Sequence, residues 1–207
     1  MTAVMVEPEP AVSAGWTRLP APLIERVRPS IVRVGGRGRS GASGIVWPPG
    51  AVLTNHHVVA GAATEVPVTL ADGRVLAARV VRASRRLDLA LLALEADALA
   101  PAPIGDSTRL RVGELVFAVG HPWGINRAAT SGIVIGLGGD LPEAERDPNR
   151  REWLMVSLVL RPGNSGGPLV DVSGRLVGVN TIMTGPSVGG AVPVHVVRQF
   201  LREATLN

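Results

Sequence analysis

Residues 161–169 read Arg161-Pro-Gly-Asn-Ser-Gly-Gly-Pro-Leu169, and this stretch is the most informative part of the sequence. Small residues on both sides of Ser165 let the chain turn sharply, so that the hydroxyl stands clear of the backbone. In such a turn the N–H groups of Gly163, Asn164 and Ser165 converge where a substrate carbonyl develops negative charge. The stretch predicts a nucleophilic serine, although Gly-x-Ser-Gly-Gly alone would be equally typical of a surface turn.

A serine hydroxyl is a weak nucleophile until a neighbouring base takes its proton, so we looked for a histidine. Two of the four histidines, His56 and His57, lie in the mostly apolar run Leu53-Thr-Asn-His-His-Val-Val59. A position at the end of a strand suits a base that is presented at a cleft. We expect His121 and His195 to be surface residues or hydrogen-bonded core residues.

The third group of such a site is a carboxylate that orients the imidazole and stabilises its charged form. Asp88 lies within Arg86-Leu-Asp-Leu-Ala-Leu-Leu92, where an aspartate is costly to bury unless something pairs with it. Asp72, Asp106 and Asp171 stand in turn or loop contexts that explain them without a catalytic role. Asp88 is therefore the expected partner, and the alternative is a solvated residue at a strand edge.

The composition favours an all-β body. Hydrophobic residues make up 46% of the 207 residues and charged residues 18%, which is enough for a buried core. The 25 glycines and 17 prolines separate short apolar runs, as in a chain of many strands and turns. We expect strands at 31–34, 44–47, 51–54, 66–70, 75–81, 87–94, 115–119, 132–137, 153–158, 168–171, 176–182 and 191–194, and a closing helix at 194–201.

The chain divides into an arm and two lobes. Residues 1–22 are rich in proline and alanine and predict a flexible N-terminal arm, and 23–28 predict a short helical turn. Residues 95–112 predict a connector, so we expect one lobe at 23–105 and a second at 106–207. The polar tract 138–151 predicts a long loop, and loops of that length are often functional.

The charge pattern argues against nucleic acid as a partner. The formal net charge is +4, and the sequence pI of about 11.2 is high because the chain has no lysine, tyrosine or cysteine to titrate below arginine. The arginines are scattered rather than gathered in a stripe with aromatic platforms. Without cysteine there is no disulfide framework and no thiolate metal site. No apolar run is long enough for a membrane span, and no export signal begins the chain, so we expect a cytoplasmic protein, or a periplasmic or extracellular one if a leader was removed.

Three motifs in one order resemble the HtrA (Deg-type) branch of trypsin-fold serine proteases. They are Thr54-Asn-His-His-Val-Val59, Asp88-Leu-Ala-Leu-Leu92 and Gly163-Asn-Ser-Gly-Gly-Pro-Leu169. Val112-Gly-Glu-Leu-Val-Phe-Ala-Val-Gly-His-Pro-Trp-Gly124, Thr130-Ser-Gly-Ile-Val134 and Gly178-Val-Asn-Thr181 also look like signatures of this branch. The resemblance implies two packed antiparallel β-barrels with His57, Asp88 and Ser165 as a catalytic triad between them and Gly163, Asn164 and Ser165 as the oxyanion hole.

The resemblance also implies how a substrate binds. Thr181, Ile182 and Met183 would form an edge strand that pairs with the substrate backbone. Leu160 and the pair Gly190 and Ala191 would line the pocket for the residue before the cut, which predicts a preference for small or medium aliphatic residues. The tract 138–151 falls where this branch has a regulatory loop.

Several positions depart from the branch. His121 stands where asparagine is usual, Ser157 where an acidic residue is common, and Gly190 where a bulky phenylalanine is common. From the sequence we expect no peptide-binding PDZ module after the protease domain. Relatives that assemble as trimers use aromatic side chains near the N-terminus, and this chain offers only Trp16 there, so a homotrimer stays an open expectation.

Two functions from different classes follow from these features. The first is a serine endopeptidase that cleaves unfolded or misfolded polypeptides through an acyl-enzyme and needs no metal or organic cofactor. The second is a peptide-binding, chaperone-like module whose protease site rests in an inactive arrangement. An esterase is a weaker alternative, because Ser165 does not lie in a strand-to-helix elbow.

Overall fold

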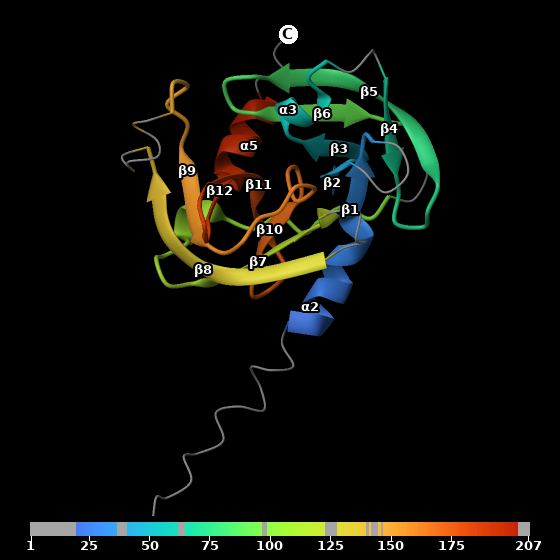
Figure 1. Ribbon diagram of the computed structural model, residues 1–207. Helices are drawn as coiled ribbons and strands as arrows, with labels where there is room; N and C mark the ends of the chain where they lie inside the picture. The colour runs from blue at the N-terminus through green and yellow to red at the C-terminus, as the bar shows by residue number, and fades with distance from the viewer. Residues whose placement is uncertain are drawn as a thin grey trace, which may run out of the picture.

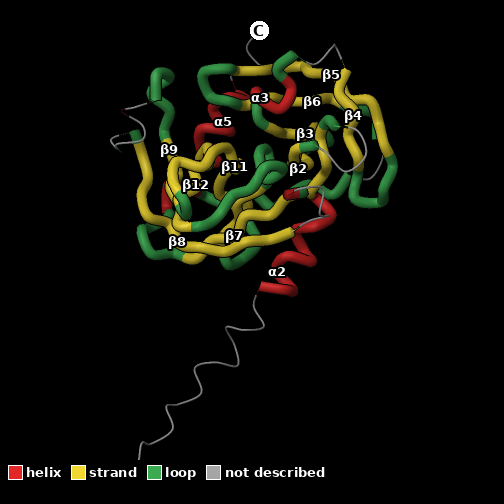
Figure 2. Tube along the Cα trace, viewed as in Figure 1, coloured by secondary structure: helices red, strands yellow, loops and turns green. Residues whose placement is uncertain are grey.

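The computed structural model describes residues 20–36, 41–61, 65–96, 99–122, 128–139, 141, 145 and 147–202, without the side chain of Ile182. Trp16 and residues 1–19 of the expected arm lie outside the described residues. The described strands form two closed barrels of six strands each (Figure 1). Within each barrel, neighbouring strands pair antiparallel. The few helices are short and lie outside the barrel walls (Figure 2). The expected all-β double barrel with a short C-terminal helix is confirmed.

The first barrel closes in the order β1-β2-β3-β6-β5-β4. Alternating apolar residues face its interior, where Val32, Val52, Val68 and Leu92 are fully or almost fully buried, as expected for strands with one face in a core. A one-residue turn after β3 leads into a short helix, α3. The strands are β1 (Ile31–Val34), β2 (Ala42–Trp47), β3 (Ala51–Thr54), β4 (Glu65–Thr69), β5 (Val75–Ser84) and β6 (Leu89–Ala93), and α3 spans His56–Val59.

The second barrel repeats this arrangement in the order β10-β11-β12-β9-β8-β7. Its interior holds Val116, Leu154, Leu169 and Val177, each buried. A short 3₁₀ helix, η2 (Ser107–Arg109), and a parallel bridge between Ile104 and Leu176 attach the connector to this barrel. The strands are β7 (Leu115–Gly120), β8 (Ala128–Gly138), β9 (Trp153–Ser157), β10 (Pro168–Asp171), β11 (Leu176–Gly185) and β12 (Val188–Pro193).

The helix before the first barrel packs against the second. Helix α2 (Pro20–Val27) begins at Pro20, within the segment expected as an arm, and η1 (Arg28–Ser30) follows it. Leu23 and Val27 are buried against Phe117, Val119 and Val170 of β7 and β10. The sequence gives no sign of this contact, because the helix and its partners are far apart along the chain.

The last helix closes the seam between the two barrels. Helix α5 spans Val194–Arg202, and Val194, Val197 and Phe200 are buried in one cluster with residues of both barrels. Ile45, Leu53 and Leu89 come from the first barrel, and Leu176, Val179 and Val192 from the second. This apolar seam, defined by these nine residues, fixes one barrel against the other.

Removal of the Phe200 ring should destabilise the seam. Phe200 is 1% exposed, and the Arg82 guanidinium lies 4.9 Å from its ring centroid. Phe200→Ala should lower the free energy of unfolding by about 3–5 kcal/mol, because the ring leaves a cavity between two rigid barrels. Urea denaturation followed by tryptophan fluorescence measures the loss. Val112→Ala, at a side chain that is 67% exposed, is the control and should change the free energy by less than about 0.5 kcal/mol; equal losses would contradict the prediction.

Candidate active site

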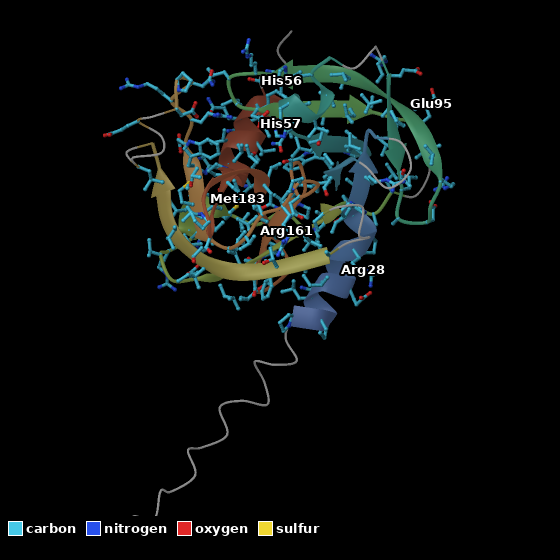
Figure 3. The ribbon with its side chains drawn as sticks, viewed as in Figure 1. Arg28, His56, His57, Glu95, Arg161 and Met183 are labelled. Atoms are coloured by element: carbon cyan, nitrogen blue, oxygen red, sulfur yellow. The ribbon has the colours of Figure 1, made fainter. Side chains whose placement is uncertain are left out.

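His57 lies at the start of α3, where the chain leaves the first barrel. Asn55, which precedes the helix, is fully buried, whereas the His57 side chain is 47% exposed. His57 therefore stays near solvent while its backbone is held by the barrel. Figure 3 shows His56 and His57 on this helix, with Arg161 and Met183 on segments of the second barrel.

Asp88 fixes the orientation of His57 through two contacts. Its Oδ2 lies 2.8 Å from His57 Nδ1, and its Oδ1 accepts a hydrogen bond of 3.0 Å from the His57 backbone N–H. An ionised carboxylate only accepts, so Nδ1 carries the proton and Nε2 is left as a base. Asp88 is 6% exposed, and the pairing with His57 is what compensates its burial.

The leucine-rich context of Asp88 predicts a position inside a strand, but Asp88 lies outside one. The strand β6 begins one residue later, at Leu89, and Asp88 has a φ of 53° in the turn before it. This left-handed backbone is uncommon for residues other than glycine, but aspartate adopts it more readily than most. The turn directs the carboxylate to His57 instead of into the leucine core.

Thr181 connects the two halves of the site. The Ser165 hydroxyl donates to the Thr181 carbonyl over 3.3 Å. The Asn55 amide donates to Thr181 Oγ1 over 2.8 Å and to the Asp88 carbonyl over 2.9 Å. The structure therefore brings Ser165, His57 and Asp88 to one place through contacts that join the barrels, and in this resting arrangement the Ser165 proton is directed at a backbone carbonyl.

The turn before Ser165 leaves two backbone N–H groups open. The Asn164 N–H donates to the Arg161 carbonyl over 2.9 Å, and Gly163 has a φ of 103° after Pro162, the pattern of a type II turn. Asn164 N–H, expected as an oxyanion donor, is therefore committed to the turn. Within the described residues the N–H groups of Gly163 and Ser165 have no hydrogen-bond acceptor, so two of the three expected oxyanion donors are open.

The expected edge strand has one free side among the described residues. β11 pairs with β12 through Ile182 and Met183, but its pairing with β10 ends at Val179, and Asn180 makes the last backbone bonds on that side. From Thr181 onward the second side of the strand is open. An extended peptide can add to such an edge through backbone hydrogen bonds.

The residues expected to line the pocket differ in their burial and in the groups that they contact. Leu160 is 8% exposed, and its N–H lies 3.1 Å from Met183 Sδ. A side chain at Gly189 would meet Leu160 Cδ1 at 3.1 Å, so Gly189, next to the expected Gly190, also borders Leu160. Ala191 is fully buried in the second barrel, and its methyl group packs in the core.

A polar anchor holds the end of the loop before β9. Asp147 is buried and accepts hydrogen bonds from Arg151 and from the Asn149 N–H, and the Arg151 guanidinium lies 4.7 Å from the Trp153 ring centroid. Burial opposes the charged form of Asp147, but these hydrogen bonds and the Arg151 charge outweigh it and hold its pKa below the ordinary 3.8. The anchor therefore depends on an ionised Asp147.

Sequence reasoning missed four residues of this site: Ser43, Asn55, His121 and Gly189. Asn55 and His121 were part of recognised motifs, but neither motif indicates which atoms their side chains reach. Ser43 belongs to the first barrel, and its hydroxyl donates to the Gly163 carbonyl in the turn before Ser165. No local sequence pattern predicts a contact between segments that are so far apart along the chain. Gly189 and Gly190 are adjacent glycines, and the sequence does not indicate that Gly189 lies against Leu160.

Two six-stranded barrels with a carboxylate–imidazole pair on one and a serine turn on the other are the fold and the groups expected of the trypsin-like class of serine peptidases. The sequence profile of the trypsin-like peptidase domain matches residues 42–179. The chain belongs to this family, and its relatives place it in the HtrA-type branch.

Relatives in plants and bacteria carry the same domain. "Protease Do-like 1, chloroplastic" of Arabidopsis thaliana is 39% identical over 163 residues, which cover 75% of this chain and 37% of that protein. A "Probable periplasmic serine endoprotease DegP-like" of Hahella chejuensis is 38% identical over 169 residues, covering 79% of this chain and 35% of that protein. The chain thus spans little more than a third of the length of these relatives.

A solved structure described as "HtrA-type protease AlgW with tripeptide" matches with a TM-score of 0.78 and 30% identity. The match covers 87% of this chain and 61% of that one. Within the described residues no helix is long and apolar enough to cross a membrane. The expectations about compartment and trimer formation stay predictions.

Gly163→Ala should disrupt the turn before Ser165. A side chain there would lie 2.3 Å from the His121 carbonyl oxygen, which is backbone and cannot move aside. Gly138 has a similar φ of 109° but open space around it, so Gly138→Ala carries the backbone strain alone. We expect Gly163→Ala to reduce labelling of Ser165 by a fluorophosphonate at least tenfold, roughly the effect of losing an oxyanion donor, and Gly138→Ala to leave it unchanged. Equal labelling of both variants would contradict the geometry.

Asp147→Asn should destabilise the fold in a pH-dependent way. The pKa of Asp147 is lowered in the folded chain, so its contribution to stability is complete above the unfolded pKa and is lost as the pH falls through the folded pKa. The variant should melt below the native chain at pH 7, and the difference should shrink below about pH 3.8. Asp72→Asn is the control, because the Asp72–Arg74 pair is exposed and contributes little. A difference that is constant with pH would exclude this role.

Proposed function

We propose that this chain is a serine endopeptidase in which Ser165 is the nucleophile, His57 the general base and Asp88 the group that orients His57. The observation that carries the proposal is the double contact between Asp88 and His57, which leaves Nε2 as the free base. The half-exposed imidazole and the buried carboxylate are the environments that these two roles require. The named relatives favour this function over the peptide-binding module.

The reaction starts when Ser165 Oγ leaves the Thr181 carbonyl and gives its proton to His57 Nε2. Oγ then attacks the substrate carbonyl carbon, and the oxygen, now negative, accepts from the open N–H groups of Gly163 and Ser165. The C–N bond breaks as His57 returns the proton to the leaving amine, which leaves an acyl group on Ser165. A water molecule, deprotonated by His57, releases the acid and restores the serine. Each proton passes through His57 Nε2: from Ser165 to the leaving amine, and then from water back to Ser165.

Unfolded polypeptides are the substrate class that fits this geometry. The free side of β11 from Thr181 to Met183 suits an extended backbone, which an unfolded chain offers more readily than a folded protein. Leu160 and the glycines at 189 and 190 offer an apolar surface without a buried carboxylate, which suits small or medium aliphatic side chains before the cut. This preference rests on residue type and position rather than on a bound peptide.

The proposed triad is tested with casein as an unfolded substrate. The native chain should cleave it, and Ser165→Ala should not. Asp88→Asn should lower the rate by roughly 10⁴, because the amide cannot hold the Nδ1 proton that leaves Nε2 as the base. His56→Ala is the matched control on the same helix and should retain activity. Cleavage by Ser165→Ala, or full activity of Asp88→Asn, would refute these assignments.

The side-chain preference is tested on the same digest. Mass spectrometry of the products should place most cuts after valine, alanine or other small aliphatic residues. Leu160→Arg introduces a charge at the predicted pocket and should raise the KM for aliphatic sites, while cleavage at other sites is spared. Dominant cleavage by the native chain after arginine or lysine would show that the pocket is built from other residues.

A further inference from the structure

Ser43 reaches from the first barrel to the turn that carries the nucleophile. It lies on β2, is fully buried, and its N–H donates to the Ser165 carbonyl over 2.9 Å. Its hydroxyl donates to the Gly163 carbonyl over 2.7 Å. One residue of the first barrel therefore holds the carbonyl groups of two residues whose N–H groups are the open pair.

His121 holds the Ser43 hydroxyl from the other side. It follows β7 of the second barrel, is 5% exposed, and its backbone N–H donates to Ser43 Oγ over 2.9 Å. Its Nδ1 lies 3.4 Å from the same oxygen.

The Ser43 hydroxyl is the donor in one of these hydrogen bonds and the acceptor in the others. A serine hydroxyl has one proton to donate and two lone pairs to accept with. The Gly163 carbonyl cannot donate, so the Ser43 proton is directed to it, and both lone pairs face His121. The contact with Nδ1 is attractive when Nδ1 carries a proton, and this fixes the rotation of the hydroxyl toward Gly163.

The surrounding glycines leave the contact no room to rearrange. A side chain at Gly120 would lie 2.7 Å from Ser43 Oγ, and one at Gly166 would lie 2.2 Å from the Ser43 carbonyl oxygen. Thr54 Oγ1 donates to that carbonyl over 2.8 Å and closes the remaining side. Ser43 is therefore packed by backbone on several sides and is not a mobile surface hydroxyl.

We propose that Ser43 and His121 are positioning residues that clamp the peptide between Gly163 and Asn164, and so keep the N–H groups of Gly163 and Ser165 open and aimed at the oxyanion. The Asn164–Arg161 bond holds the N–H of the Gly163–Asn164 peptide, and the Ser43–Gly163 bond holds its C=O. Rotation of this peptide, which lies between the two peptides that carry the open N–H groups, therefore breaks both hydrogen bonds. The catalytic consequence rests on the proposed peptidase function, whereas the clamp itself does not.

Ser43→Ala removes the clamp with little change of volume, and Ser30→Ala is its matched control. Ser30 is 2% exposed, and its hydroxyl donates to the Val27 carbonyl over 2.7 Å, far from the site. Ser30→Ala loses one buried hydroxyl bond, whereas Ser43→Ala loses the bond to the Gly163 carbonyl and the bond from the His121 N–H, so Ser43→Ala should lose more stability. A comparison at equal folded fraction therefore isolates the effect on the turn.

The first readout does not need activity. Hydrogen–deuterium exchange of the peptide that covers residues 158–166 should be several-fold faster in Ser43→Ala than in the native chain and in Ser30→Ala. Equal exchange in the two variants would overturn the clamp, whether or not the chain is a peptidase.

The second readout is the rate at which a fluorophosphonate labels Ser165. We expect at least a tenfold loss in Ser43→Ala, a smaller loss in His121→Ala, and no change in Ser30→Ala. If His121 acts through Ser43, the double variant should be no slower than Ser43→Ala, and additive losses would overturn the proposed relation. A native chain that is not labelled refutes the peptidase function and leaves the exchange result to decide the clamp. A labelled native chain with an equally reactive Ser43→Ala refutes the clamp alone.

Discussion

The apolar seam between the barrels is the constraint on which the site depends. His57 and Asp88 come from the first barrel, and Ser165 and Thr181 from the second, so no single barrel holds a complete set of groups. The seam is rigid because buried side chains of both barrels and of α5 interlock in one cluster, and close-packed interiors transmit small shifts instead of absorbing them. The positions of the polar groups are thus set by the packing of apolar side chains that are not themselves part of the site.

Polar contacts across the seam refine what the packing sets. Asn55 bonds both Asp88 and Thr181, and Ser43 bonds both Gly163 and Ser165. Ser43, Asn55, Asp88 and Thr181 are buried, and hydrogen bonds shielded from water are stronger and more costly to lose. The apolar packing therefore sets where the residues of the site lie, and the hydrogen bonds set how their polar groups are oriented.

The fold could be predicted from the sequence in large part, and the direction of side chains could not. Strands such as β1, β3 and β10 were predicted with the observed bounds, because turn residues delimit their apolar runs. The motifs around His57, Asp88 and Ser165 named residues that the structure brings together. Asp88 was nevertheless placed in a strand, because a leucine-rich context does not reveal a left-handed φ. The packing of α2, the bond from Ser43 and the commitment of the Asn164 N–H depend on segments or turn geometry that no local pattern encodes.

The place of α5 at the end of the described chain has a consequence for the order in which the protein is made. Synthesis runs from the N-terminus, so β1 to β6 emerge with His57 and Asp88 while the second barrel still lacks strands. β12 and α5, which complete that barrel and the seam, are the last described elements to emerge. A partly synthesised chain thus contains His57 and Asp88 before the barrel that positions Ser165 is complete, and the three groups come together only after β12 and α5 have been made.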